Sequence, residues 1–154
     1  MITKEQYRDS ILAHKLSVKI GLQRVIDDLH KRADNHDDDK LEGETLDSFY
    51  EISGKFEHAK FGSQEYENVL DKLKPTLDKH YAKNEHHPQH NENGVNGMNF
   101  MSMLEMLVDW KSASSAYGDN SFEESMQINK KRFGIDEQLY GIMVNTAKSL
   151  GYLD

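Results

Sequence analysis

Residues 99–117 read NFMSMLEMLVDWKSASSAY, and this stretch decides the fold class. Its large apolar side chains follow the three-to-four-residue spacing of one face of an α-helix. They are Phe100, Met103, Leu104, Leu107 and Trp110. The chain has 2 prolines among its 154 residues and little of the strict apolar–polar alternation that half-buried strands need. The sequence therefore predicts an all-α fold.

Five more helical segments are expected around this one, for about six in all. Two of them begin with capping-box sequences, Thr3-x-x-Gln6 and Ser121-x-x-Glu124. Because proline suits the first turn of a helix and disrupts later turns, Pro75 predicts a break or kink in the third segment. The expected spans, in chain order, are 3–30, 45–61, 63–83, 99–117, 121–134 and 136–151. Without an internal repeat or a linker, they are expected to form one compact domain over residues 1–154.

A long histidine-rich loop is expected before the fourth helix. The stretch NEHHPQHNENGVNG, residues 84–97, is polar and has no helical periodicity. Of the 8 histidines in the chain, four lie between positions 80 and 90. They are His80, His86, His87 and His90. Histidines at a helix end and in the following loop can converge on one metal ion, although a solvated polar loop is the alternative.

The composition restricts the function classes. The formal net charge is -8, and the one short basic cluster is Lys130-Lys131-Arg132. Since nucleic-acid polymers are bound by clustered Lys and Arg, such a polymer is not expected as a partner. A small phosphorylated molecule is compatible, because a bound divalent cation reverses the local field of an acidic protein. With no cysteine, thiolate metal sites are excluded. No apolar run approaches ~20 residues and the N-terminus has no apolar signal region, so we expect no membrane span and a cytoplasmic location.

Histidines and carboxylates elsewhere in the chain offer ligands for a metal. His36 and Asp37 follow the first helix, and Lys40 comes three residues after Asp37. Imidazole and carboxylate together suit Mn, Fe, Co or Zn, whereas calcium favours oxygen ligands alone. The alternative for this pair is a polar helix-capping loop. His14 lies among apolar residues of the first helix, where it is either a ligand or a hydrogen-bonded core residue.

Two carboxylates stand in the apolar stretch quoted first. Glu105 and Asp109 are four residues apart and therefore share one helix face. Carboxylates are rarely buried unless they are paired or bound to metal. Asp109 is a candidate ligand, and Glu105 is expected to orient a histidine. Alternatively, both lie at the exposed edge of the helix or pair with Lys111.

In chain order, these residues resemble the HD superfamily, whose members are all-helical, metal-dependent phosphohydrolases. The superfamily pattern has an early helical histidine, a His-Asp pair, further histidines in two-metal forms and a distal aspartate. The matching positions are His14, His36-Asp37, the histidines from His80 to His90, and Asp109. The resemblance implies a single HD-like helical domain.

Two closer likenesses narrow the comparison. His36-Asp37-x-x-Lys40 followed by His86-His87 is similar to the cyclic-dinucleotide-degrading branch, in which an acidic residue comes where this chain has Pro88. The chain as a whole looks like a small family found in phages and bacteria. Its motifs His-Tyr-x-x-Asn-x-His-His-Pro-x-His and Glu-Met-Leu-x-Asp-Trp-Lys stand at residues 80–90 and 105–111.

The resemblance implies a metal-dependent phosphohydrolase acting on a phosphomonoester or phosphodiester of a small nucleotide, with one or two divalent transition-metal ions. The implied metal ligands come from His14, His36, Asp37, His80, His86, His90 and Asp109. Lys40 would offset charge on the phosphate, and Glu105 or a loop histidine such as His87 would donate a proton. The alternative is a catalytically silent nucleotide- or protein-binding module of phage origin. Both place the protein in the cytoplasm of a bacterium or phage-infected host, as a monomer or a homo-oligomer.

Overall fold

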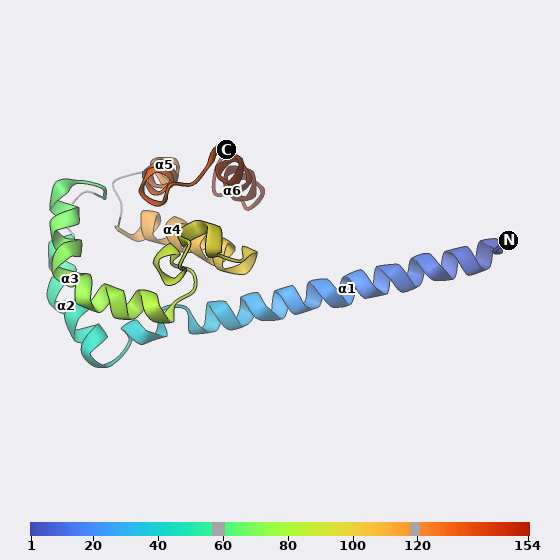
Figure 1. Cartoon of the computed structure of the whole chain (residues 1–154), viewed down its shortest axis with the longest axis horizontal. Helices are drawn as coiled ribbons and strands as arrows, with labels where there is room; N and C mark the ends of the chain where they lie inside the picture. The colour runs from blue at the N-terminus through green and yellow to red at the C-terminus, as the bar shows by residue number, and fades with distance from the viewer. Residues whose placement is uncertain (57–60, 118–120) are drawn as a thin grey trace. The chain divides into compact units, whose positions relative to one another are not determined.

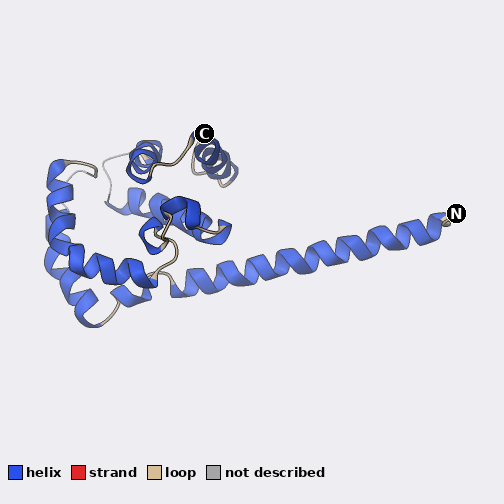
Figure 2. Ribbon diagram, in the orientation of Figure 1, coloured by secondary structure: helices blue, strands red, loops and turns tan. Residues whose placement is uncertain are grey.

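The computed structural model describes residues 1–56, 61–117 and 121–154, which contain six α-helices, three short 3-10 helices and no strand (Figure 2). The predicted all-α fold is confirmed for these residues. The chain divides into two compact units, Met1–Asn35 and His36–Asp154. The single domain expected over residues 1–154 stays a prediction. Within the described ranges, no helix is long and apolar enough to cross a membrane.

The first unit is one helix, α1 (Lys4–Asn35). Its predicted capping box is confirmed: the backbone N–H of Thr3 donates to Gln6 Oε1 at 2.9 Å, and that of Gln6 donates to Thr3 Oγ1 at 3.2 Å. The apolar spacing predicts helix to about His30, with the run 33–35 ending it, and the helix ends at Asn35, within that run. Polar residues without glycine or proline do not break a helix, and the Asn35 amide donates to the carbonyl of Lys31 at 2.6 Å.

The second unit begins with the short helix η1 (Asp38–Lys40), followed by α2 (Gly43–Phe56) and α3 (Gln64–Lys83), which pack against each other. The second expected span ran to residue 61, and residues 57–60 of it lie outside the described residues. α3 continues through Pro75 and changes direction along its length (Figure 1), so the prediction of a kink is confirmed. The proline ring removes one backbone hydrogen bond and clashes with the preceding turn, which bends the helix.

The predicted loop follows α3, with two single-turn helices, η2 (Pro88–His90) and η3 (Gly94–Gly97). Three α-helices complete the unit: α4 (Phe100–Tyr117), α5 (Phe122–Phe133) and α6 (Glu137–Ser149). The last two begin with N-terminal caps, and that of α5 is the capping box predicted from the sequence. Ser121 and Glu124 form a complete capping box, and Asp136 accepts from the backbone N–H of Leu139 at 2.8 Å.

The main core of the second unit lies among α4, α5 and α6, which are neighbours in Figure 1. Its buried side chains are Val95, Met98, Met106, Leu107, Phe122, Met126, Ile135, Met143 and Ala147. Met106 and Leu107 come from the stretch of α4 that also carries Glu105 and Asp109. This packing fixes α4 by its apolar face, so the two carboxylates are held on a rigid helix.

Candidate metal centre

Asp37 lies in a tight turn immediately before η1. Asp37 has φ 58° and ψ 19°, and it is the one non-glycine residue with positive φ in the described part of the chain. Aspartate tolerates this left-handed conformation better than most residues, at a cost in strain. The turn directs Asp37, Asp39 and Lys40 into one cluster of polar side chains, described below.

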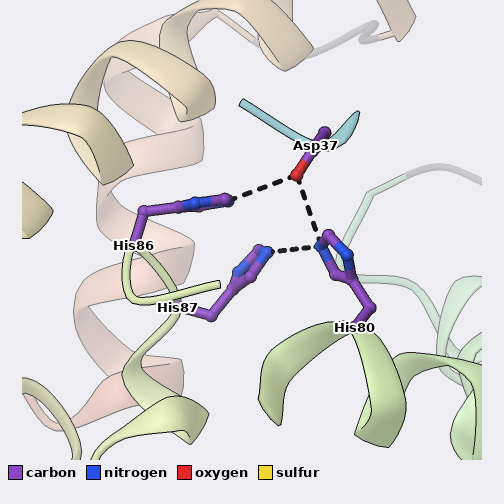
Figure 3. A group of neighbouring side chains, drawn as sticks. All are labelled: Asp37, His80, His86 and His87. Carbon is purple, nitrogen blue, oxygen red and sulfur yellow. Dashed lines mark hydrogen bonds and ion pairs between the residues drawn. The ribbon is translucent and has the colours of Figure 1, made fainter. Parts of the chain in front are cut away.

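Four side chains of the second unit converge on a small volume. Asp37, His80, His86 and His87 each offer one ligand atom, and these atoms lie within 4.8 Å of one another. Figure 3 shows the carboxylate of Asp37 facing the imidazoles, with His80 on the last turn of α3 and the other two histidines on the loop after it. Asp37 Oδ1 lies 3.4 Å from His80 Nε2 and 3.5 Å from His86 Nε2. His80 Nε2 and His87 Nε2 are 2.8 Å apart.

This arrangement fits a divalent metal ion. In the described residues, Asp37 Oδ1 and His86 Nε2 are buried and have no hydrogen-bond partner. Buried polar atoms without a hydrogen-bond partner are costly, and a bound metal ion would satisfy both of these atoms. Metal–ligand bonds of about 2.0–2.1 Å in a tetrahedron separate neighbouring ligands by about 3.3 Å. The two distances from Asp37 Oδ1 are close to that value, so one ion would contact this oxygen and both imidazoles.

Hydrogen bonds to carboxylates determine which ring nitrogen of each histidine faces the cluster. His80 Nδ1 lies 2.9 Å and 3.0 Å from the two carboxylate oxygens of Asp39, which leaves Nε2 to face Asp37. Glu105 Oε1 lies 2.9 Å from His36 Nδ1 and 3.2 Å from His86 Nδ1. A carboxylate that accepts the Nδ1–H proton leaves the Nε2 lone pair free for a metal. His80 and His86 therefore offer Nε2 as a ligand atom, and His36 does so once its ring has lost its second proton.

His36 defines a second group beside the first. Its Nε2 lies 3.6 Å from Asp109 Oδ1 and 3.7 Å from Asp37 Oδ2. Lys40 Nζ donates to the same Asp37 oxygen at 2.7 Å. Asp37 thus faces His36 and Lys40 with one oxygen and His80 and His86 with the other.

The histidines of the cluster differ in protonation state, because their surroundings shift their pKa values in opposite directions. Hydrogen bonding to Asp109, and then to Glu105, raises the pKa of His36 to about 9 against the opposing effect of burial. Burial and the neighbouring histidines lower the pKa of His87 to about 2. Burial also lowers the pKa of His80 and His86. Burial alone would raise the pKa of Asp37, but Lys40, His36 and His80 together hold this pKa below its usual value. At neutral pH His80, His86 and His87 are therefore neutral imidazoles beside the Asp37 carboxylate, which is the state that metals bind, whereas His36 is charged.

Most residues predicted for the site are brought together by the second unit. They are His36, Asp37, Lys40, His80, His86, His87, Glu105 and Asp109. Lys111 donates to Ser115 Oγ at 3.2 Å, and Glu105 contacts histidines. The buried-site explanation of Glu105 is thus favoured over the exposed-edge one.

One predicted ligand of the second unit, His90, does not join the cluster. His90 is exposed, and its Nδ1 is 3.0 Å from the carbonyl of Tyr81, so it donates to the backbone. His14 lies on α1, in the first unit, and its role as a ligand stays a prediction.

The sequence reasoning missed Asp39 and Asn84. The Asn84 amide donates to Asp39 Oδ1 at 3.0 Å and to the carbonyl of His80 at 2.8 Å. Asp39 carried no distinguishing signal, because it is one of three consecutive aspartates and its partner His80 lies 41 residues away. Asn84 closes α3 as its C-terminal cap, a position where asparagine is ordinary and carries no functional signal.

The fold and the site together define a class: an all-α protein with a candidate centre for a divalent metal built from histidines and carboxylates. The chain belongs to the family of unknown function DUF5662, whose model matches residues 3–150. No curated protein and no solved structure matches it.

Proposed function

We propose that this protein is a metal-dependent phosphohydrolase that cleaves a phosphomonoester or phosphodiester of a small nucleotide. The observation that carries the proposal is the pair of buried, partnerless ligand atoms, Asp37 Oδ1 and His86 Nε2, which face each other at 3.5 Å beside His80. The order of the residues along the chain, which resembles the HD superfamily, supports the reaction class.

The ligand roles in this proposal follow the contacts. His80, His86 and His87 act with Asp37 as one group of ligands, and His36 and Asp109 extend it on the other side of the Asp37 carboxylate. The two oxygens of Asp37 point to different neighbours, which suits either one ion or two that share this carboxylate. Mixed imidazole and carboxylate ligands suit Mn, Fe, Co or Zn.

A bound divalent ion would supply Lewis acidity, lowering the pKa of a coordinated water towards ~7 and neutralising charge on phosphate oxygens. In the net reaction, the oxygen of one water becomes bonded to phosphorus, the phosphorus–oxygen ester bond breaks, and the leaving oxygen gains a proton. Lys40, whose ammonium lies 2.7 Å from Asp37 Oδ2, would attract the phosphate oxygens at the edge of the cluster.

Glu105 is one of the two expected proton donors, and its contacts favour a different role. Its Oε1 is hydrogen-bonded to His36 Nδ1 at 2.9 Å and lies 3.2 Å from His86 Nδ1, which supports an orienting role. His87 is neutral at physiological pH because its pKa is lowered to about 2, and this supports a role as a ligand.

The test is a phosphate-release assay across mono-, tri- and cyclic nucleotides, with metal analysis of untagged protein. Asp37→Ala is expected to abolish hydrolysis and lower the metal content while the helical circular dichroism is unchanged. The matched control is Asp38→Ala, because Asp38 is the exposed neighbour in the same turn. Full activity of Asp37→Ala, or of metal-stripped protein, would contradict the proposal. Stoichiometric nucleotide binding without turnover would favour the binding module instead.

A further inference from the structure

Both ring nitrogens of His80 face an aspartate of the same turn. Asp37 Oδ1 is 3.4 Å from Nε2, and Asp39 Oδ2 is 2.9 Å from Nδ1. His80 is almost completely buried, with 1% of its side chain exposed, and 11% of the Asp39 side chain is exposed. The imidazole ring of His80 cannot flip about its Cβ–Cγ bond without losing its contact with Asp39.

We propose that Asp39 is a positioning residue that fixes His80 with Nε2 towards the metal, and that Asn84 holds Asp39 in place. The inference rests on the proposed metal centre. Asp39 accepts the Nδ1–H of His80, so the neutral ring keeps its lone pair on Nε2, where Asp37 Oδ1 and His87 lie. Without Asp39, the proton is free to move to Nε2, and a ring with an Nε2–H cannot bind a metal through that atom.

Asn84 joins the turn that carries Asp39 to the last turn of α3. Its Nδ2 donates to Asp39 Oδ1 and to the carbonyl of His80, while its backbone N–H donates to the same carbonyl at 3.2 Å. Asn84 Nδ2 is also 3.0 Å from His80 Nδ1. Because a carboxylate is the stronger acceptor for a ring N–H, the Nδ1 proton belongs on Asp39. The amide then serves to align the carboxylate with the ring.

The role of Asp39 is separate from that of Glu105. Glu105, from α4, contacts the Nδ1 atoms of His36 and His86, whereas Asp39, from η1, contacts that of His80. Removing Asp39 therefore affects one imidazole and leaves the other two oriented. Loss of such an outer hydrogen-bond partner typically weakens metal affinity by about 10–100-fold.

The experiment compares full-length wild-type protein with Asp39→Ala, Asp39→Asn and the exposed-neighbour control Asp38→Asn. Zn²⁺ affinity is measured by competition with a chelator, and the visible absorption of bound Co²⁺ reports the ligand geometry. In metal-free samples, long-range ¹H–¹⁵N spectra report the tautomer of His80. We expect Asp39→Ala to bind Zn²⁺ about 10–100-fold more weakly with an altered Co²⁺ spectrum and loss of the Nδ1–H tautomer. Asp39→Asn, which keeps an acceptor oxygen, should fall between the two, and Asp38→Asn should match wild type.

The outcomes distinguish this inference from the proposed function. Wild-type affinity, Co²⁺ spectrum and tautomer in Asp39→Ala would overturn the role of Asp39 while leaving the metal centre intact. A wild-type protein that binds neither ion would overturn both. Should Asp39→Ala not fold, as judged by circular dichroism, Asp39→Asn decides: unchanged affinity and tautomer there would also reject the inference.

Discussion

Metal binding to this protein should release one proton from His36 at neutral pH. The pKa of His36 is raised to about 9 by Asp109 and Glu105, so in the metal-free protein at pH 7 the charged imidazole exceeds the neutral one by about 100 to 1. A metal binds the neutral ring, so the proton must leave when His36 becomes a ligand. The apparent affinity should therefore rise about tenfold per pH unit between pH 6 and 8 and level off above pH 9.

The other histidines should add almost nothing to this release. The pKa of His87 is lowered to about 2, and burial also lowers the pKa of His80 and His86. These rings are already neutral at pH 7 and have no proton to lose. Four histidines with ordinary pKa values would instead release a growing number of protons as the pH falls towards 6.

Calorimetric titration of metal-free protein with Zn²⁺, in buffers of different ionisation enthalpy, counts the protons. His36→Gln is the comparison, because it removes the titrating ring and keeps the group formed by Asp37, His80, His86 and His87. A proton lost from a coordinated water is common to both proteins and cancels in the difference. We expect a difference of about one proton at pH 7. A difference near zero, or an affinity independent of pH from 6 to 8, would refute the assignment of His36.

Three further predictions concern the stability of metal-free protein, measured by urea unfolding in the presence of a chelator. The pKa of His87 is lowered on folding, so the contribution of His87 to the free energy of unfolding is fully present above about pH 6.5 and is lost as the pH falls below that value. Between pH 7.5 and 5.5 the loss of stability is about 1 kcal/mol. The variant His87→Gln should not show this loss. A pH dependence unchanged in that variant would contradict the lowered pKa. Ser121→Ala removes the capping box of α5 and should cost about 1 kcal/mol, against no effect for the exposed Ser112→Ala. Leu73→Ala, at a side chain only 1% exposed on α3, should cost about 2–5 kcal/mol, and a loss below 1 kcal/mol would show that Leu73 does not lie in a packed core.

Much of the fold was predictable because helix signals are local. The caps at Thr3, Ser121 and Asp136 act on backbone groups three residues away, so each could be identified from a few neighbouring residues. The kink of α3 follows from Pro75 alone. α1 continues past the apolar spacing that ends near His30 because residues 33–35 contain no glycine or proline, and the Asn35 amide donates to the carbonyl of Lys31 in the preceding turn.

The candidate site was predictable to the extent that residue type indicates chemistry. The clustering of His80, His86 and His87, and the carboxylate of Glu105 in an apolar stretch, were visible in the sequence. Asp39 was not distinguishable, since it is one of three consecutive aspartates and its partner His80 lies 41 residues away. His90 is the opposite case. Its position in the histidine motif predicted a metal ligand, but in the structure it is exposed and its Nδ1 contacts the carbonyl of Tyr81.

The sequence by itself determined that the protein is helical, where most helices start, and that histidines and carboxylates suited to a divalent metal are present. Only the tertiary structure decided how these side chains are used. The left-handed turn at Asp37 brings Asp37 and Asp39 to opposite nitrogens of His80, and the packed face of α4 holds Glu105 against His36 and His86. Which nitrogen of an imidazole is free depends on the carboxylate that holds the other one. That pairing joins segments distant in the chain, so no local pattern of residues specifies it.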